Sequence, residues 1–382
     1  MKNNNWGKWM ASAALAAAVV LGVLCWREKN VGLMLWTMGL SALAFTIAVP
    51  RGRNTFLFIT SLSLSLAIAE TVLALHNPVH SQTHFDPSSG FVNNYWYYSD
   101  IGGQPRPGVH TARSLDEQDH VVYDVTYSIG SDGFRITPGA PATVGKKQIH
   151  INFFGCSFTF GEGLQDRQTL PYFAQAEGHD ITVKNYGVSG YGVHQALAIM
   201  QSDRHPAGDV NFLLTAPWHA DRSACIPSYA VGSPRYRLDQ QGQLLRAGFC
   251  GGNAITKRSA IVSSLKTLMH YGGSQDQQIA LYLAIIKQMA VLSKERGQMF
   301  VIGFIKADQD FFQGSWSNDK IVAALRQDGI TVIDMTLAAT SEQTQMAYFL
   351  SPLDKHPSML ANKTRAELLL NYLQTEPQPA KK

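Results

Sequence analysis

The chain has 382 residues, of which 45% are hydrophobic and 16% are charged, and its formal net charge is +4. Lysine and arginine are dispersed, and no basic run is interleaved with aromatic residues, so the sequence argues against a nucleic-acid-binding protein. The first 75 residues are nearly all apolar, whereas the remainder has the composition of a globular α/β protein that is long enough to bury a core.

Three apolar runs open the chain, at residues 10–26, 31–49 and 55–75. Each is close to the length that crosses about 30 Å of hydrocarbon as a helix. The short charged joints between them predict helices that alternate in direction across the bilayer. We therefore expect residues 1–75 to form a three-helix transmembrane anchor.

The basic residues near these runs predict the orientation of the anchor. After the third run no lysine or arginine occurs until Arg106. Basic residues concentrate on the cytoplasmic side, so the N-terminus is expected inside and everything after the third helix outside the cytoplasmic (inner) membrane. The four that would share the inner face are Lys2, Lys8, Arg51 and Arg53, and the two on the outer face are Arg27 and Lys29.

Two other arrangements of the N-terminus stay open, and so does the environment of one acidic residue in the third run. A cleaved signal peptide would need small residues after residues 10–26, and a lipid anchor at Cys25 would need a small residue where Leu24 stands. Glu70 within the third run is costly in hydrocarbon unless it contacts protein or lies near the membrane surface.

The rest of the chain divides into an extension, a larger domain and a tail. Residues 76–146 are rich in Gly, Pro, Ser and aromatic residues, which predicts an N-terminal extension of short strands and loops. Residues 147–375 alternate between apolar strands and helices, interrupted by an insertion at about 217–278 with a helix near 260–268. Residues 376–382 are expected to be a disordered tail.

The alternation predicts a three-layer α/β/α sandwich with a parallel central sheet, because strands separated by helices of this length need parallel crossovers. The expected strands cover residues 147–154, 181–186, 210–215, 299–305 and 331–335. The expected helices cover residues 170–177, 193–202, 279–296, 319–328 and 359–373.

The insertion contains Cys225 and Cys250. Outside the cytoplasm this pair would form a disulfide that closes a loop, and two free thiols are the alternative.

Ser157 is the candidate nucleophile. It follows the first strand, at the carboxyl end of a parallel sheet, which is where ligands bind in open α/β folds. A serine hydroxyl there is inert unless a base takes its proton and donors hold the developing oxyanion.

Two later turns supply groups of this kind. The turn at 185–192 is rich in glycine, and its Gly190 allows close backbone approach. His356, on the last loop before the final helix, can reach the first strand's loop, and Asp354 can fix its tautomer. The alternative is that Asp354 and His356 merely start the helix.

Taken together, the three segments resemble the SGNH/GDSL hydrolase superfamily. They are Gly-Cys-Ser-Phe-Thr at 155–159, Asn-Tyr-Gly-Val-Ser-Gly at 185–190 and Asp-Lys-His-Pro at 354–357. The resemblance implies an SGNH (flavodoxin-like) domain with Ser157 as nucleophile, Asp354 and His356 as acid and base, and the N–H groups of Ser157 and Gly190 as oxyanion donors.

The sequence departs from this pattern in two places. The usual oxyanion asparagine after the third strand is absent, and His219 or a nearby backbone amide is a candidate substitute, although a structural histidine is equally consistent. Asp354 and His356 are two residues apart rather than three. The shorter spacing resembles the alginate-type polysaccharide O-acetyltransferases, which work beside a multispanning acyl-transfer protein.

We therefore expect a serine-dependent esterase or O-acyltransferase that acts outside the cytoplasm on acyl (acetyl) esters of a carbohydrate or cell-envelope polymer. No cofactor, metal site or nucleic acid is expected. The expected partners are the substrate, the membrane and a multispanning acyltransferase. The alternatives are a non-catalytic membrane-docked partner of such an acyltransferase, or a lipase or thioesterase.

Overall fold

A computed structural model describes residues 16, 18, 31–48, 53–76, 83–91, 95–139, 148–178, 180–202, 208–251, 261, 273–337 and 341–375. The chain forms two compact units. One comprises Met1–His80 with Gly252–Tyr271, and the other comprises Ser81–Gly251 with Gly272–Lys382. Each unit is described by itself.

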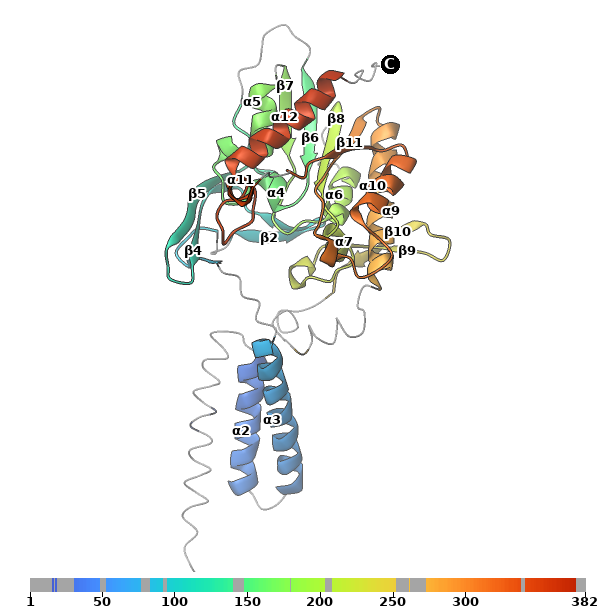
Figure 1. Ribbon diagram of the computed structural model, residues 1–382. Coiled ribbons are helices and arrows are strands. Elements are labelled where there is room, and N and C mark those ends of the chain that lie inside the picture. Colours follow the sequence, from blue (N-terminus) through green and yellow to red (C-terminus); the bar gives the residue numbers. More distant parts are fainter. Residues whose placement is uncertain are drawn as a thin grey trace, which may run out of the picture. The chain divides into compact units, whose positions relative to one another are not determined.

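The smaller unit contains a pair of packed helices, α2 (Val31–Ala48) and α3 (Arg53–His76), drawn in blue in Figure 1. A Cβ atom on Gly39 would lie 2.8 Å from the Leu64 side chain, so this glycine is a point of close approach between the helices. These helices form where the second and third membrane spans were expected, and the first expected span falls outside the described residues apart from Ala16 and Ala18. Among the helices that the structure describes, none combines the length and the apolar character needed to cross a membrane.

Glu70 of α3 is only 4% exposed. One of its carboxylate oxygens accepts a hydrogen bond of 2.9 Å from the backbone N–H of Ile261. Of the two explanations for this acid, contact with protein is therefore the one observed, and the contact comes from the same chain.

The larger unit is built on a five-stranded, fully parallel sheet of order β12-β11-β8-β6-β7. This confirms the expected α/β architecture. The strands are β6 (Ile149–Phe154), β7 (Ile181–Asn185), β8 (Val210–Thr215), β11 (Met299–Phe304) and β12 (Thr331–Asp334).

Helices cover both faces of the sheet (Figure 1). Successive strand residues point to opposite faces, so Phe153 and Phe154 of β6 enter different cores. The first core packs α5 (Leu170–Glu177) and α12 (Met359–Thr375) on one face, and the second packs α6 (Val193–Gln201), α9 (Gln275–Glu295) and α10 (Asn318–Gln327) on the other.

The insertion after β8 contains a short helix, α7 (His219–Ser223), and an antiparallel hairpin of β9 (Pro234–Leu238) and β10 (Leu244–Phe249). The hairpin was not predicted. The helix expected near residues 260–268 lies outside the described residues except for Ile261, which is helical. A further short helix, α11 (Glu342–Ala347), follows β12.

The extension forms antiparallel strands in two small sheets. One has the order β1-β4-β5, and β2 pairs with β3 in the other. Its own small core includes Tyr127 and Phe160, so it packs against the segment that follows Ser157. The strands are β1 (Thr83–Phe85), β2 (Trp96–Ser99), β3 (Gly102–Pro105), β4 (Gly108–Asp116) and β5 (Val121–Ile129).

Candidate active site

Ser157 begins a single helical turn, α4 (Ser157–Phe160), directly after β6. The turn depends on Gly155, where a Cβ atom would lie 2.2 Å from Thr159 Oγ1 and 2.9 Å from the backbone oxygen of Leu214. A larger residue would therefore force Thr159 of the same turn, or the backbone of β8, to move. Ser157 is 6% exposed, so its hydroxyl is held in a defined and nearly buried position.

His356 and Asp354 lie on the loop that precedes α12, and this loop meets the end of β6. The Nε2 atom of His356 lies 3.0 Å from Ser157 Oγ, and its Nδ1 atom lies 2.6 Å from Asp354 Oδ1. Asp354 Oδ1 also accepts the backbone N–H of His356 at 3.0 Å. The three side chains thus form one continuous hydrogen-bonded chain, with the histidine between the hydroxyl and the carboxylate.

The charges around these three hydrogen-bonded side chains favour proton transfer toward the histidine. Burial disfavours the charged forms of both Asp354 and His356. Even so, hydrogen bonds from His356 hold the pKa of Asp354 below its usual value. The charges of Glu162 and Asp354, together with the Asp354 hydrogen bond, outweigh the burial of His356 and raise its pKa to about 9. Such an imidazole is a strong base, and its protonated form is well stabilised.

Glu162 is a second carboxylate beside the histidine, and the sequence motif gave no reason to assign it a role. Its Oε2 atom lies 3.8 Å from His356 Nε2 and accepts a hydrogen bond of 2.6 Å from Ser189 Oγ. The side chain is 13% exposed. Glu162 therefore joins the Ser157 segment to the turn that carries Gly190.

The turn at 185–192 is fixed by Asn185, whose side chain donates to the Thr159 backbone oxygen and accepts from the Gly187 N–H. Gly190 has φ +81°, a left-handed conformation that favours glycine. Within the described residues, no acceptor is seen for the backbone N–H of Ser157 or of Gly190. Both groups thus remain available to bind an oxygen.

His219 has a different environment from the one expected of an oxyanion donor. It is 1% exposed, and its Nδ1 atom pairs with Thr215 Oγ1 at 3.0 Å. Burial lowers its pKa well below the usual value, so the ring is neutral. It does not line either of the two cavities beside Phe158, the neighbour of Ser157. Of the two roles expected for His219, oxyanion donor or structural histidine, this environment fits the structural one.

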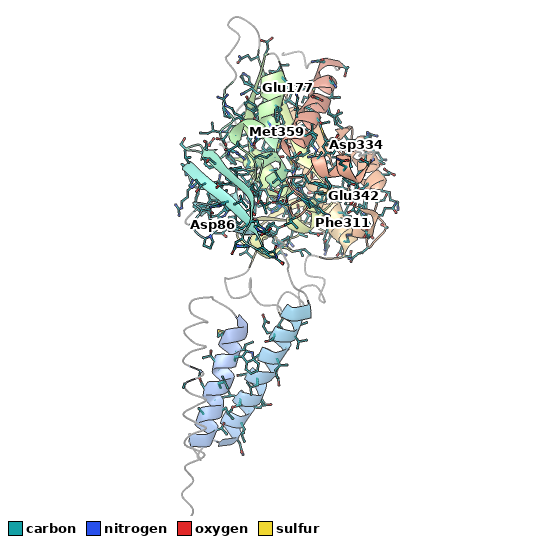
Figure 2. All side chains as sticks on the ribbon, turned by 60° about the vertical axis from the view of Figure 1, so that its left-hand side comes forward. Asp86, Glu177, Phe311, Asp334, Glu342 and Met359 are labelled. Carbon is teal, nitrogen blue, oxygen red and sulfur yellow. A yellow bond between two sulfur atoms is a disulfide. The ribbon has the colours of Figure 1, made fainter. Side chains whose placement is uncertain are left out.

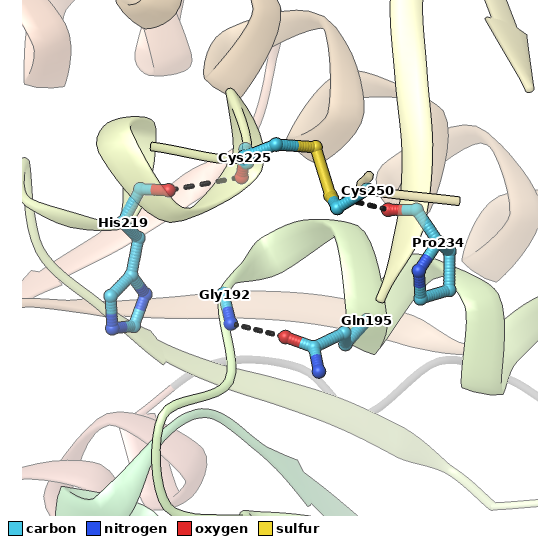
Figure 3. Close-up of a disulfide and its surroundings, with 7 residues drawn as sticks. Gly192, Gln195, His219, Cys225, Pro234 and Cys250 are labelled. Atoms are coloured by element: carbon cyan, nitrogen blue, oxygen red, sulfur yellow. Dashed lines mark hydrogen bonds between the residues drawn. A yellow bond between two sulfur atoms is a disulfide. The ribbon is translucent and has the colours of Figure 1, made fainter. Parts of the chain in front are cut away.

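Cys225 and Cys250 form a disulfide, shown in Figure 3 with His219 and Gln195 nearby. The bridge connects the end of α7 to the end of the β9–β10 hairpin. It therefore closes residues 225–250 of the insertion into a loop beside α6, where Gln195 Oε1 accepts the Gly192 N–H at 3.0 Å.

A cavity of about 430 Å³ opens over the histidine and is lined by Glu162, Asp354 and His356. Its opposite wall comes from the extension, through β1 (Thr83–Phe85) and Tyr123 of β5. The extension thus helps to shape the candidate active site, and His84 belongs to this wall although the sequence gave it no role.

Arg135, another residue without a predicted role, connects the extension to the segment after Ser157. Its guanidinium is fully buried, lies 2.9 Å from Asp166 Oδ1 and donates to the backbone oxygens of Phe160, Gly161 and Leu164. It also packs over the rings of Tyr127 and Phe160. Arg135 therefore holds the loop that carries Glu162 in place.

Across the described ranges, no group of three or more His, Cys, Asp or Glu side chains could hold a metal ion. The arrangement instead has the parts needed for nucleophilic chemistry at serine: a hydroxyl, a base, an acid that orients the base, and free backbone donors.

No family model and no curated protein matches the chain. Solved structures similar to it include a lipolytic protein of the G-D-S-L family from Veillonella parvula, with 14% identity and a TM-score of 0.36 over 59% of this chain and 99% of that one. An esterase from Pseudoalteromonas has 12% identity and a TM-score of 0.35 over 59% and 97%. An acetylxylan esterase from Geobacillus stearothermophilus has 13% identity and a TM-score of 0.35 over 63% and 98%.

Proposed function

We propose that the protein is a serine-dependent esterase or O-acyltransferase of the SGNH type, acting on acyl esters of a carbohydrate or cell-envelope polymer. The observation that carries this proposal is the hydrogen-bonded chain from Asp354 through His356 to Ser157. A serine in such a chain is activated by the neighbouring base, and the acid keeps the base in the correct tautomer.

In the proposed reaction, Ser157 Oγ attacks the ester carbonyl carbon while His356 Nε2 takes the hydroxyl proton. The N–H groups of Ser157 and Gly190 hold the oxyanion of the tetrahedral intermediate. The intermediate collapses, the C–O bond to the alcohol breaks, and His356 returns the proton to the departing alkoxide. An acyl-serine remains.

The second half of the reaction regenerates the serine. His356 takes a proton from water or from a sugar hydroxyl, whose oxygen attacks the acyl carbon. The second intermediate releases the acid or the new ester, and Ser157 recovers its proton. Hydrolysis and acyl transfer share the first half and differ in how well the acceptor is bound and water excluded.

One observation favours acyl transfer over hydrolysis as the second half of the reaction. Two cavities adjoin the histidine loop, one of about 430 Å³ and one of about 570 Å³, and both are lined by Phe158 and Lys355. Two molecules, an acyl donor and an acceptor, could therefore approach the same serine from different sides.

We also propose that the protein acts outside the cytoplasm and is held at the inner membrane, beside a multispanning acyltransferase. The disulfide between Cys225 and Cys250 supports an oxidising compartment. Large apolar side chains of α3, among them Phe58 at 68% exposed and Ile68 at 53%, support contact with lipid or an apolar partner. Protease protection in intact spheroplasts tests the location, because a domain outside the cytoplasm is cut without lysis and a cytoplasmic one is not.

Hydrolysis of a small acetyl ester by the full chain, wild type against Ser157→Ala, tests the chemistry. We expect release of acetate by the wild type and loss of at least about a thousandfold in the variant. If both proteins are folded and neither releases acetate in water or forms an acetylated sugar when an oligosaccharide acceptor is added, the catalytic proposal fails and the non-catalytic docking protein is the better account.

A further inference from the structure

The larger of the two cavities, about 570 Å³, lies on the side of Phe158 that faces Trp218. Phe158 follows the nucleophile in sequence, and its ring centroid lies 5.7 Å from that of His356. Pro357, the neighbour of His356, also lines the cavity. The cavity therefore adjoins the segments that carry Ser157 and His356.

Arg365 of α12 lines the same cavity. It is 6% exposed, and its Nε donates to the backbone oxygen of Met335 at 3.0 Å. Its Nη1 is buried and has no hydrogen-bond partner within the described part of the chain. No carboxylate forms an ion pair with it among the residues that the structure describes.

An unpaired buried guanidinium is expensive. Removing a charge from water is unfavourable, and the loss is recovered only through an opposite charge with good hydrogen-bond geometry. Burial lowers the pKa of Arg365 to about 10, so the side chain still carries its charge at neutral pH. Among the described residues, the guanidinium contacts the Phe158 ring, whose centroid lies 6.0 Å from its Cζ, and the Met335 backbone oxygen, but no carboxylate neutralises its charge.

The other charges of the cavity differ from Arg365, and one of them, Lys355, is exposed. Lys306 is 42% exposed and already pairs with Asp334 at 2.9 Å. Asp308 and Asp310 also line the cavity, but neither forms an ion pair with Arg365 in the described ranges. Figure 2 labels Phe311, also in the lining, and Asp334 on the same flank of the unit, whereas Asp86, next to β1 of the other cavity, lies on the opposite flank.

We propose that this cavity is a subsite for an anionic group, a carboxylate or a phosphate, with Arg365 as its counter-ion. Trp218 and Phe311 provide flat apolar surface around the charge, as pockets for ring-shaped ligands do. The anion therefore belongs to an acidic sugar or a sugar phosphate. That this molecule is the one acylated or deacylated at Ser157 rests on the proposed function, whereas its binding by Arg365 does not.

Calorimetry on the full chain with Ser157→Ala tests this inference without turnover. The probes are methyl glucuronoside, glucose 6-phosphate and the neutral methyl glucoside. We expect one of the anionic sugars to bind at least about tenfold more tightly than the neutral one, and the better of the two identifies the source of the anion.

Adding Arg365→Gln to the Ser157→Ala chain should weaken binding of that sugar by about tenfold to a hundredfold and leave the affinity for the neutral sugar unchanged. Lys306→Gln is the matched control, a cation of the same cavity that has its own partner, and we expect a change of less than about threefold. Arg365→Lys, which keeps the charge, should retain part of the preference if Arg365→Gln folds poorly.

The inference would be overturned by equal affinities for the three sugars or by no binding of any of them. It would also be overturned if a folded Arg365→Gln variant bound the anionic sugar as tightly as before. Because the titrations need no catalysis, selective anion binding by a chain that cleaves no ester would refute only the proposed function.

Discussion

The carboxylate of Glu162 lies 3.8 Å from His356 Nε2, the ring nitrogen that faces Ser157, whereas Asp354 lies 2.6 Å from Nδ1 on the other side of the ring. The imidazole is therefore placed between two acids. One acid fixes the tautomer, and the other lies where the proton arrives.

This placement predicts a pH dependence. His356 accepts a proton only when it is neutral, so kcat/KM should rise as the pH passes through its pKa of about 9. Glu162→Gln removes a negative charge, which lowers that pKa and moves the rise to lower pH. At pH 7 the fraction of neutral histidine, and with it kcat/KM, should increase by about threefold to tenfold.

Ser189→Ala is the control for Glu162→Gln, because it removes the hydrogen bond to the carboxylate and leaves the charge. Its profile should keep the position of the wild-type rise. If the two variants shift the profile equally, the role of Glu162 is structural rather than electrostatic.

Asp354→Asn should lower kcat by about a hundredfold to ten-thousandfold. The amide can donate to Nδ1, which would place the imidazole proton on Nε2 and prevent that atom from accepting the serine proton. Steady-state kinetics with an unchanged melting temperature would establish this. A loss of less than about fivefold would show that the acid does not orient the base.

Arg135→Met should destabilise the protein by about 3 kcal/mol, because three backbone oxygens and Asp166 lose a buried charged donor. Urea denaturation measures the free energy of unfolding. Arg113→Met is the control, since Arg113 is 43% exposed in its ion pairs with Asp86 and Asp124 and should contribute less than about 1 kcal/mol. Equal effects of the two substitutions would contradict the anchoring role of Arg135.

Replacing Cys225 and Cys250 together by serine opens a loop with a sequence separation of 25 residues. The restored freedom of the unfolded chain should reduce the free energy of unfolding by about 3 to 4 kcal/mol. A reductant should destabilise the wild type by a similar amount and leave the double variant unchanged. If the reductant also destabilises the double variant, its effect on the wild type is not due to reduction of the disulfide.

The central sheet could be predicted from the sequence because each of its strands is a compact apolar run. The bounds of β8 and α5 are those expected, and β6 was placed to within two residues. The β9–β10 hairpin was missed because β9 alternates between buried and exposed residues over only five positions and β10 has no fully buried residue. A local sequence reading detects long burial patterns, and the alternation in β9 is too short to stand out.

The candidate site was predictable only in part. Ser157, Asp354 and His356 lie in short segments with recognisable spacing, and the structure brings their side chains together. Arg135 and His84 belong to the extension, and no local pattern tells which part of the larger domain they will lie beside. Glu162 lies five residues after Ser157, but its position beside His356 depends on the turn that Arg135 holds. The aromatic-rich composition of residues 76–146 was the available signal, and it did not indicate a wall of the site.

Mass spectrometry of the acylated enzyme tests the central claim most directly. The full chain, incubated with a slow ester or an alkyl fluorophosphonate, should gain one acyl or phosphonyl group on the peptide that contains Ser157. His356→Gln should slow the labelling by at least about a hundredfold, since the serine loses its base. Labelling at another residue, or equal labelling of a folded Ser157→Ala variant, would contradict the assignment of Ser157 as the nucleophile.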